Sequence, residues 1–133
     1  GGRLMTLNMN QGIELQGLIT RLRNEKVPIK TAYKFNKLIT ILEKELSFYN
    51  EELAKIIDQY AQKDKDGNPI LSDDKTSIQI IKDKIDECQQ KMEELSSIEF
   101  EVKGVSFKID ELKDINLTIL EMRSLMPLIE EEG

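Results

Sequence analysis

The sequence contains no histidine and no tryptophan, a single cysteine, Cys88, and only 5% aromatic residues in a chain of 133. The lack of histidine removes the commonest general base and the commonest transition-metal ligand. A single thiol cannot form a disulfide within the chain or a zinc site made of several thiolates. Few aromatic rings disfavour stacking platforms for nucleic-acid bases. These absences predict a non-enzymatic protein that needs no cofactor.

Basic residues are outnumbered, with 19 Lys and Arg against 25 Asp and Glu and a formal net charge of −6. Phosphate backbones and anionic lipids attract basic surfaces, so this composition predicts neither nucleic acid nor membrane as a partner. No apolar run approaches the length of about 18 residues that spans a bilayer, and the opening residues lack the apolar stretch of a secretory signal. We therefore expect a cytoplasmic protein whose partners are proteins.

Proline is also scarce, and helical patterns fill most of the chain. The length predicts a single domain, residues 1–133. A first helix is expected over residues 10–24, with Asn10 as its N-cap. Pro28 lacks an N–H and pushes Val27 toward an extended conformation, so the pattern ends there.

The clearest helical pattern covers residues 31–62. Its apolar residues recur at alternating spacings of three and four, which is the heptad seam of a coiled coil. The members of this seam are Ala32, Phe35, Ile39, Leu42, Leu46, Tyr49, Leu53, Ile56 and Tyr60. A helix of this length would extend for about 48 Å. It therefore needs a partner along its whole seam.

A second heptad pattern predicts a partner helix over residues 73–97, capped by Ser72 or Asp73. The apolar seam of this helix consists of Ile78, Ile81, Ile85, Cys88, Met92 and Leu95. Because the connection between the two helices is short, they are expected to lie antiparallel as a long coiled-coil hairpin.

The period then changes from that of a helix to that of a strand. Residues 98–109 alternate between apolar and polar side chains, and Lys103-Gly104 predicts a two-residue turn. We therefore expect a small β-hairpin with six apolar side chains on one face. These side chains are Ile98, Phe100, Val102, Val105, Phe107 and Ile109.

A capping box formed by Thr118 and Glu121 predicts a C-terminal helix over residues 118–131. Pro127 should kink or end this helix. The predicted fold class is therefore mainly α, with a minor β part. It consists of a long antiparallel helical hairpin, a small β-hairpin, and short N- and C-terminal helices.

The loop "QKDKDGNPILSD", residues 62–73, has the outline of a calcium-binding loop, because carboxylates flank a central glycine between two helical patterns. Asp64, Asp66 and Asp73 would take the third, fifth and twelfth positions. Gln62 stands where a carboxylate is expected, and an aspartate at the twelfth position reaches less far than the usual glutamate. Asp-Gly and Asn-Pro are common turn residues. We interpret the loop as a connector, and a calcium site is the alternative.

Other residues suggest chemistry but have a simpler structural interpretation. Asp73 and Asp74 resemble a catalytic pair, yet acidic residues also suit the first turn of a helix. Cys88 resembles a nucleophile, yet the sequence has no histidine to activate it. Tyr49 and Tyr60 fit an amphipathic core. Three methionines suggest a soft surface for a partner, although core packing is the simpler interpretation; they are Met92, Met122 and Met126.

The acidic balance also suggests a mimic of nucleic acid. Such a mimic needs its carboxylates concentrated on one surface, whereas lysines here alternate with them, as in Lys82-Asp83-Lys84. That mixture is typical of a solvated helix face with ion pairs four residues apart.

Several segments in order carry a resemblance: "VPIKTAYKFNKLITILEKEL", "LAKI", "GNPIL", "ECQQKMEELSSIEFEV" and "LKDINLTILEMRSLMPLIEEE". Together they resemble a family of small bacteriophage and prophage proteins of Gram-positive bacteria, known as a domain of unknown function. The matching motifs are Val-Pro-Ile-Lys at residues 27–30, Glu-Phe-Glu-Val at 99–102, and Leu117-Thr118 through Met122 and Leu125. Pro127 departs from the family pattern. The family has no assigned catalytic residues, so the resemblance implies only a phage or prophage setting inside a bacterial cell.

Taken together, the sequence favours a non-enzymatic protein–protein interaction factor with an accessory, assembly or scaffold role. Its partner would be a phage or host protein, and two helical hairpins have seams wide enough to associate into a four-helix homo-oligomer. The alternative is an acidic inhibitor of a host protein such as a defence nuclease.

Overall fold

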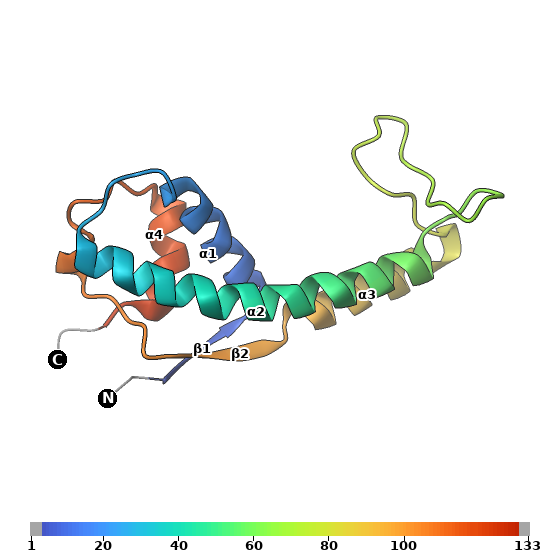
Figure 1. Cartoon of the computed structure of the whole chain (residues 1–133). Helices are drawn as coiled ribbons and strands as arrows, with labels where there is room; N and C mark the ends of the chain where they lie inside the picture. Colours follow the sequence, from blue (N-terminus) through green and yellow to red (C-terminus); the bar gives the residue numbers. More distant parts are fainter. Residues whose placement is uncertain (1–3, 131–133) are drawn as a thin grey trace. The chain divides into compact units, whose positions relative to one another are not determined.

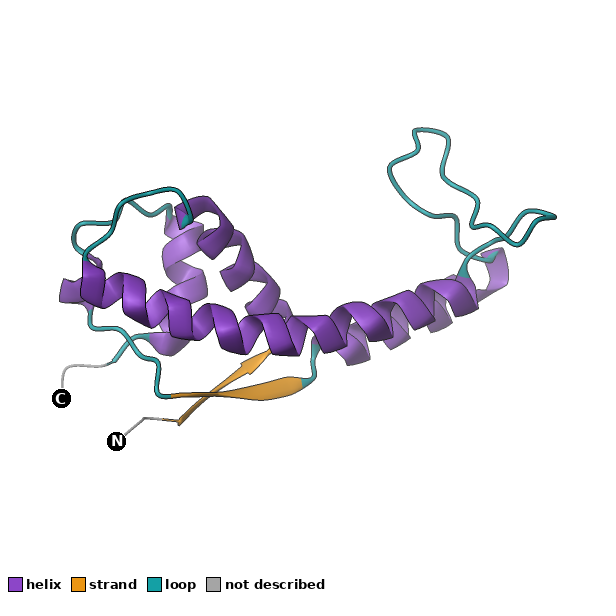
Figure 2. Cartoon of the chain, viewed as in Figure 1, coloured by secondary structure: helices purple, strands orange, loops and turns teal. Residues whose placement is uncertain are grey.

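The computed structural model describes residues 4–130 and is mainly helical, with a small antiparallel sheet, as predicted (Figures 1 and 2). The elements in chain order are β1 (Leu4–Asn8), α1 (Met9–Leu22), α2 (Ile29–Tyr60), the 3-10 helix η1 (Lys82–Lys84), α3 (Ile85–Ser96), β2 (Glu99–Lys103), the 3-10 helix η2 (Ile109–Leu112), α4 (Ile119–Leu125) and the 3-10 helix η3 (Met126–Leu128).

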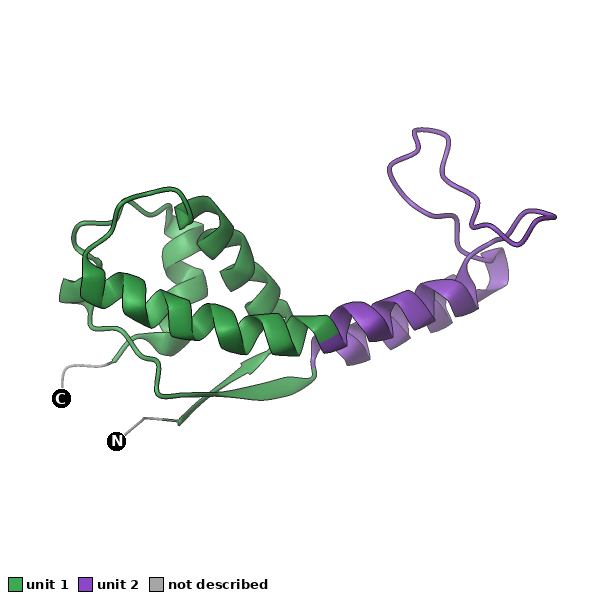
Figure 3. Cartoon of the chain, in the orientation of Figure 1, with its two compact units in different colours: residues 1–47, 98–133 green, residues 48–97 purple. Residues whose placement is uncertain are grey.

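The chain divides into two compact units, shown in different colours in Figure 3. Unit 1 is formed by residues 1–47 and 98–133, and unit 2 by residues 48–97. Helix α2 contributes its first part to unit 1 and its second part to unit 2. A single domain stays a prediction.

Helix α1 begins two residues earlier than expected. Asn8, not Asn10, is its N-cap: the Asn8 side-chain oxygen accepts a hydrogen bond from the Gln11 N–H at 2.8 Å, and the Gln11 side chain accepts one from the Asn8 N–H at 2.8 Å. If Asn10 were the N-cap, the residue three positions later would be Ile13, whose apolar side chain cannot accept a hydrogen bond from the Asn10 N–H. The reciprocal capping box therefore determines where the helix starts.

Helix α2 closely follows the predicted range of 31–62, but its seam is not covered by one partner. Within unit 1 its buried apolar side chains are Phe35, Leu38, Leu42 and Leu46. The ring of Phe35 lies 4.8 Å from that of Phe107, between centroids, so this part of the seam belongs to the core of unit 1. Helix α3 has only 12 residues, about 18 Å, and is too short for the 32 residues of α2. The expectation of a partner along the whole seam is wrong.

The predicted β-hairpin over residues 98–109 is also wrong. Strand β2 pairs antiparallel with β1, which the sequence analysis missed; Met5 lies opposite Val102 and Leu7 opposite Phe100. A type I′ turn requires positive φ at both central residues. Only Gly104 has one, at +78°, and Lys103 does not.

The segment after Gly104 leaves β2 and pairs elsewhere in unit 1. The Phe107 N–H donates to the Leu128 carbonyl at 2.8 Å, and the Glu130 N–H donates to the Phe107 carbonyl at 2.7 Å. Four of the six apolar side chains predicted for the hairpin face are buried, but Ile98 and Ile109 are 40% and 63% exposed. The expectation that all six side chains share one covered face is therefore wrong for Ile98 and Ile109.

The predicted helix over residues 73–97 begins only at Ile85, after η1. In place of its first turns, the Asp74 carboxylate accepts hydrogen bonds from the Ser72 hydroxyl and from the N–H and hydroxyl of Thr76. Lys75 has φ of +60°, which a right-handed helix does not allow. Short polar side chains thus form hydrogen bonds with the nearby backbone, and these bonds replace the first turns of the predicted helix.

The connection between α2 and η1 is closed by a cycle of backbone hydrogen bonds. The Gln62 N–H donates to the Gln79 carbonyl, the Gln79 N–H to the Ile70 carbonyl, and the Ile70 N–H to the Gln62 carbonyl, each at 2.8 Å. Three stretches far apart in the loop therefore lie side by side. These backbone hydrogen bonds, together with those accepted by the Asp64 and Asp74 side chains, order the loop.

The C-terminal capping box is confirmed. The Thr118 hydroxyl accepts from the Glu121 N–H at 3.1 Å, and the Glu121 carboxylate accepts from the Thr118 N–H at 2.9 Å. Helix α4 ends at Leu125 and passes into η3, which contains Pro127. Pro127 thus ends the α-helix, as expected. The range 118–131 was too long, and its last residue lies outside the described residues.

Two glycines of α1 give a matched stability test. A Cβ at Gly17 would meet nothing within 4 Å, so Gly17→Ala should raise the free energy of unfolding by about 0.5–1 kcal/mol through helix propensity. A Cβ at Gly12 would lie 3.1 Å from the tip of the buried Phe100 ring. Gly12→Ala should therefore lose most or all of that gain. Denaturant unfolding of both variants checks this, and equal stabilisation would contradict the described packing.

Candidate interaction site

Unit 2 buries few apolar side chains. Its buried members are Tyr60, Ala61, Cys88 and Leu95. Two predicted seam residues of α3, Ile85 and Met92, are 50% and 39% exposed, and Phe48 of α2 is 41% exposed. A further apolar residue of the loop, Leu71, is 48% exposed. Ile85 and Met92 are seven residues apart and share one face of α3. We use the name apolar surface of unit 2 for this face, together with the exposed side chains of Phe48 and Leu71 in the same unit.

Tyr60 connects the end of α2 to the residue that precedes η1. The Tyr60 carbonyl accepts a hydrogen bond from the Ile81 N–H at 2.9 Å, and its side chain is 1% exposed. Burial raises the pKa of the Tyr60 hydroxyl above its ordinary value, and the neighbouring carboxylate of Glu87 raises it further. Tyr60 is therefore a core residue, as predicted. Tyr49 is half-buried.

Cys88 is buried, at 3% exposed, and burial raises the pKa of its thiol. The thiolate is the reactive form of cysteine, so the folded protein should react slowly with a disulfide reagent such as dithionitrobenzoate. Unfolding in guanidinium should restore the rate of a free thiol. Stopped-flow absorbance measures both rates. Equal rates in the folded and unfolded protein would show that this residue is accessible and would revive a nucleophilic role.

The carboxylates of the proposed calcium loop do not converge. Across residues 4–130 no group of three or more His, Cys, Asp or Glu side chains is arranged to hold a metal ion. One oxygen of Asp64 instead accepts from the N–H groups of Asp66 and Asn68, at 2.9 and 3.0 Å. Gly67 has φ of +83°, as this turn requires. Asp64 and Asp66 therefore form a turn, and Asp73 lies in the next one; the connector stays the interpretation of the loop and a calcium site the alternative.

The other acidic pair, Asp73-Asp74, is also part of a turn. Hydrogen bonds from Ser72 and then from Thr76 lower the pKa of Asp74 to about 2. A carboxyl group with such a low pKa stays ionised near neutral pH and is a poor general acid. Asp74 therefore supports the loop as an ionised hydrogen-bond acceptor.

Unit 2 also carries most of the acidic excess of the chain. Residues 48–97 contain twelve acidic residues and seven basic ones, which accounts for nearly all of the net charge of −6. Some of these charges pair locally: Lys55 lies 3.0 Å from Glu52, and Lys63 lies 2.9 Å from Asp58. The unit thus combines partly exposed apolar side chains with a net negative charge.

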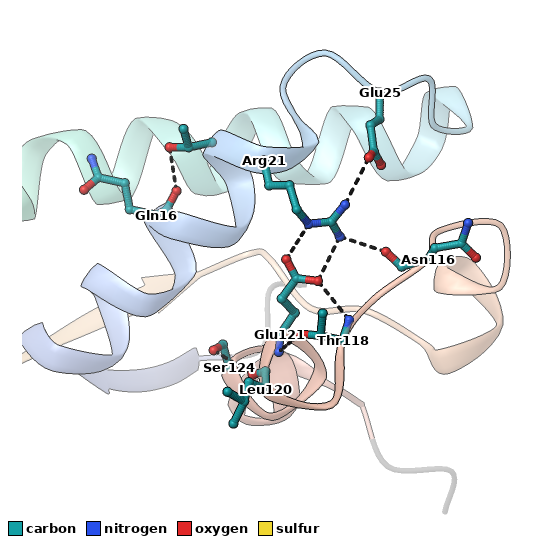
Figure 4. A network of polar contacts seen from close by, with 9 residues as sticks. Gln16, Arg21, Glu25, Asn116, Thr118, Leu120, Glu121 and Ser124 are labelled. Carbon is teal, nitrogen blue, oxygen red and sulfur yellow. Dashed lines mark hydrogen bonds and ion pairs between the residues drawn. The ribbon is translucent and has the colours of Figure 1, made fainter.

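In unit 1, a polar network joins α1 to α4 (Figure 4). The Arg21 guanidinium donates through two nitrogens to the two carboxylate oxygens of Glu121, and it also donates to the Asn116 carbonyl at 2.7 Å. Glu25 accepts from the same guanidinium at 3.0 Å. The hydrogen bond from Arg21 lowers the pKa of Glu121, with a further contribution from the Thr118 N–H. Each nitrogen of the Arg21 guanidinium donates at least one hydrogen bond within the network, so the network positions α4 against α1.

A second ion pair of unit 1 is largely buried. Lys34 donates to Glu111 at 2.8 Å, with side chains 23% and 11% exposed, and it also donates to the Ser106 carbonyl at 2.8 Å. The Thr31 hydroxyl donates to the Glu111 carbonyl at 2.9 Å. The second carboxylate oxygen of Glu111 is buried and has no hydrogen-bond partner among residues 4–130. This pair was not predicted, because its members are 77 residues apart and no local pattern connects them.

Two of the hollows in unit 1 have mainly apolar linings. One, of about 210 Å³, lies between α1 and α2 and is lined mainly by apolar side chains, including Leu22, Phe35 and Ile39. The other, of about 590 Å³, is a shallow depression beside η2, lined by residues such as Leu112 and Met122. Neither brings together a nucleophile and a base. Met122 is half-buried and Met126 is 55% exposed, whereas Met92 belongs to unit 2, so the three methionines do not form one surface within either unit.

Comparison with known proteins gives no match to a family model, to a curated protein or to a solved structure. Among the described residues, the longest helix, α2, is too polar to cross a lipid bilayer, and no other helix meets that requirement either.

Proposed function

We propose that this chain is a non-enzymatic protein–protein interaction factor with an accessory, assembly or scaffold role. The observation that carries the proposal is the apolar surface of unit 2. Side chains placed at heptad positions, such as Ile85 and Met92, remain about half exposed. Exposed apolar side chains on neighbouring helices of a protein are typical of surfaces that bind another protein.

The second part of α2 and α3 would then act as a short coiled-coil hairpin. Its heptad spacing, the burial of Cys88 and Leu95, and the link between Tyr60 and Ile81 support this arrangement. Two such hairpins can associate into a four-helix bundle. A homo-oligomer formed in this way would cover the apolar surface of unit 2.

Multi-angle light scattering over a range of protein concentrations in high salt tests this proposal. The wild-type chain should exceed the monomer mass as concentration rises. The variant Ile85→Ser with Met92→Ser should remain monomeric with unchanged helix content. A matched control is Ile119→Ser with Leu120→Ser, which removes two exposed apolar side chains of α4 in unit 1. Monomeric behaviour of the wild type at all concentrations, or equal effects of both variants, would reject the homo-oligomer.

The phage or prophage setting, in the cytoplasm of a bacterial host, is supported only by the sequence resemblance described above. Affinity capture of the tagged chain from lysogenic cells, compared with the Ile85→Ser, Met92→Ser variant, tests for a phage or host protein partner. A partner that binds the wild type and not the variant would support the proposal. Equal recovery with both chains would place binding elsewhere.

The second candidate function is an acidic inhibitor of a host protein such as a defence nuclease. The observation that favours it is the acidic excess of residues 48–97. Interleaved lysines, such as Lys82 and Lys84, weaken it because they dilute the charge. Addition of the purified chain to a nuclease assay in host lysate tests this function, and an unchanged cleavage rate would exclude inhibition of the nucleases in that lysate.

A further inference from the structure

A row of lysines marks the part of α2 that belongs to unit 1. Lys30, Lys37 and Lys44 recur every seven residues and therefore share one face of the helix, about 10.5 Å apart. All three are exposed, and Tyr33, on the same face, is 63% exposed. Lys37 lies 5.5 Å above the Tyr33 ring. We name Lys30, Tyr33, Lys37 and Lys44 the lysine stripe.

The lysine stripe lacks direct ion pairs within the described residues, although the charge of Lys30 contributes to lowering the pKa of Glu111. None of its three lysines forms an ion pair there. Lys34, one residue beyond Tyr33, instead turns to Glu111 and the Ser106 carbonyl. The stripe therefore presents three exposed positive charges at a regular spacing, none of them in a direct ion pair among residues 4–130.

A complementary row lies on η1 and α3 of unit 2. Asp83, Asp86 and Glu93 follow spacings of three and seven residues, on the side of the helix away from the buried Cys88 and Leu95. All three carboxylates are exposed, and none takes part in an ion pair among residues 4–130. We name Asp83, Asp86 and Glu93 the carboxylate stripe.

We propose that the lysine stripe of one copy of this chain binds the carboxylate stripe of a second copy. Asp86 and Glu93 are seven residues apart, as are successive members of the lysine stripe. Two helices laid side by side can therefore pair both carboxylates with lysines at once. The two stripes belong to different units, so each copy offers both a donor and an acceptor surface. This ionic contact goes beyond the apolar association proposed above and uses different residues.

Exposed ion pairs are individually weak and are screened by salt, because the Debye length falls from about 10 Å at 0.1 M to about 3 Å at 1 M. The test therefore uses the full chain carrying Ile85→Ser and Met92→Ser, in which the apolar association is removed. Sedimentation velocity should show association in low salt, weakened at least about tenfold in 1 M sodium chloride. Association of equal strength at both salt concentrations would overturn the proposal.

Charge-reversal variants test the ionic contact most directly. Lys30→Glu, Lys37→Glu and Lys44→Glu together should abolish the association, and so should Asp83→Lys, Asp86→Lys and Glu93→Lys together. An equimolar mixture of the two variants should associate again, because each reversed stripe meets its complement. A control with the same change in net charge is Lys65→Glu, Lys75→Glu and Lys113→Glu, which should leave association intact. Circular dichroism confirms that each variant is folded.

The outcomes separate this proposal from the proposed function. No recovery in the mixture, or loss of association in the control, would overturn the ionic contact. A monomer in low salt that binds duplex DNA through the lysine stripe would also overturn it, in favour of a polyanion partner. Neither result would bear on the apolar association, which is measured separately in high salt on the wild-type chain.

Discussion

Phe107→Ala should lower the free energy of unfolding by about 3–5 kcal/mol. The Phe107 side chain is 0% exposed and packs against Phe35, and the Lys34 ammonium lies 5.7 Å from its ring. Truncation of the ring leaves a cavity and removes the contact between α2 and the segment after β2. Typical domains have a total stability of about 5–15 kcal/mol, so such a loss should leave unit 1 marginal.

Chemical denaturation followed by circular dichroism measures this effect. Phe48→Ala is the matched control, because it removes the same ring from a position that is 41% exposed. The control should cost about 1 kcal/mol or less. Equal midpoints for the two variants would contradict the described core of unit 1.

The second large effect is expected at the buried ion pair. Lys34→Ala leaves the Glu111 carboxylate largely buried without its cation, while its second oxygen already lacks a partner. The free energy of unfolding at neutral pH should fall by about 2 kcal/mol. The exposed pair of Lys55 with Glu52 is the control, and Lys55→Ala should cost about 0.5 kcal/mol or less. A cost for Lys34→Ala no greater than that of the control would contradict the described burial.

The same pair predicts a dependence of stability on pH. Burial alone raises the pKa of Glu111, but hydrogen bonds from Lys34 and the Lys108 N–H, with the charge of Lys34, outweigh it, so the pKa is lowered. A lowered carboxyl pKa stabilises the fold above the unfolded value of about 4.3 and ceases to do so as pH falls through the folded value. Glu111→Gln should therefore flatten the acid side of the stability curve, measured by thermal melting. An unchanged acid side would show that Glu111 titrates normally.

The sequence predicted the elements whose local signals agree with their tertiary setting. The heptad pattern predicted both ends of α2 to within two residues. A long apolar face favours a helix whichever part of the protein covers it, so the identity of the partner did not matter. Thr118 and Glu121 predicted the start of α4, because a capping box is satisfied within one turn.

The errors arose where local signals competed with partners distant in sequence. Lys103-Gly104 suggested a tight turn, but β1 offered β2 a partner about 95 residues earlier in the chain, and pairing preferences of that range are not visible in either segment alone. The apolar spacing of Ile78 and Ile81 suggested a helix, but the Asp74 turn and the backbone cycle of Gln62, Ile70 and Gln79 determine the conformation there.

The candidate site was only partly predictable. Seam positions such as Cys88 and Met92 were recognised as apolar, but their spacing cannot say which of them another helix covers. How much of each seam side chain is exposed depends on the length of α3. This helix begins at Ile85, twelve residues after the start expected at residue 73. The lysine and carboxylate stripes were visible in the sequence only as interleaved charge. Helix boundaries were needed to assign them to single faces.

Oxidative footprinting of methionine tests the central claim most directly, because it reports the exposure of individual side chains. Met92 lies on the apolar surface of unit 2 at 39% exposed, and Met126 of unit 1, at 55% exposed, is an internal reference. As the concentration of the wild-type chain rises in high salt, the oxidation rate of Met92 should fall while that of Met126 stays constant. A Met92 rate that does not change with concentration or on addition of a captured partner would contradict an interaction through this surface.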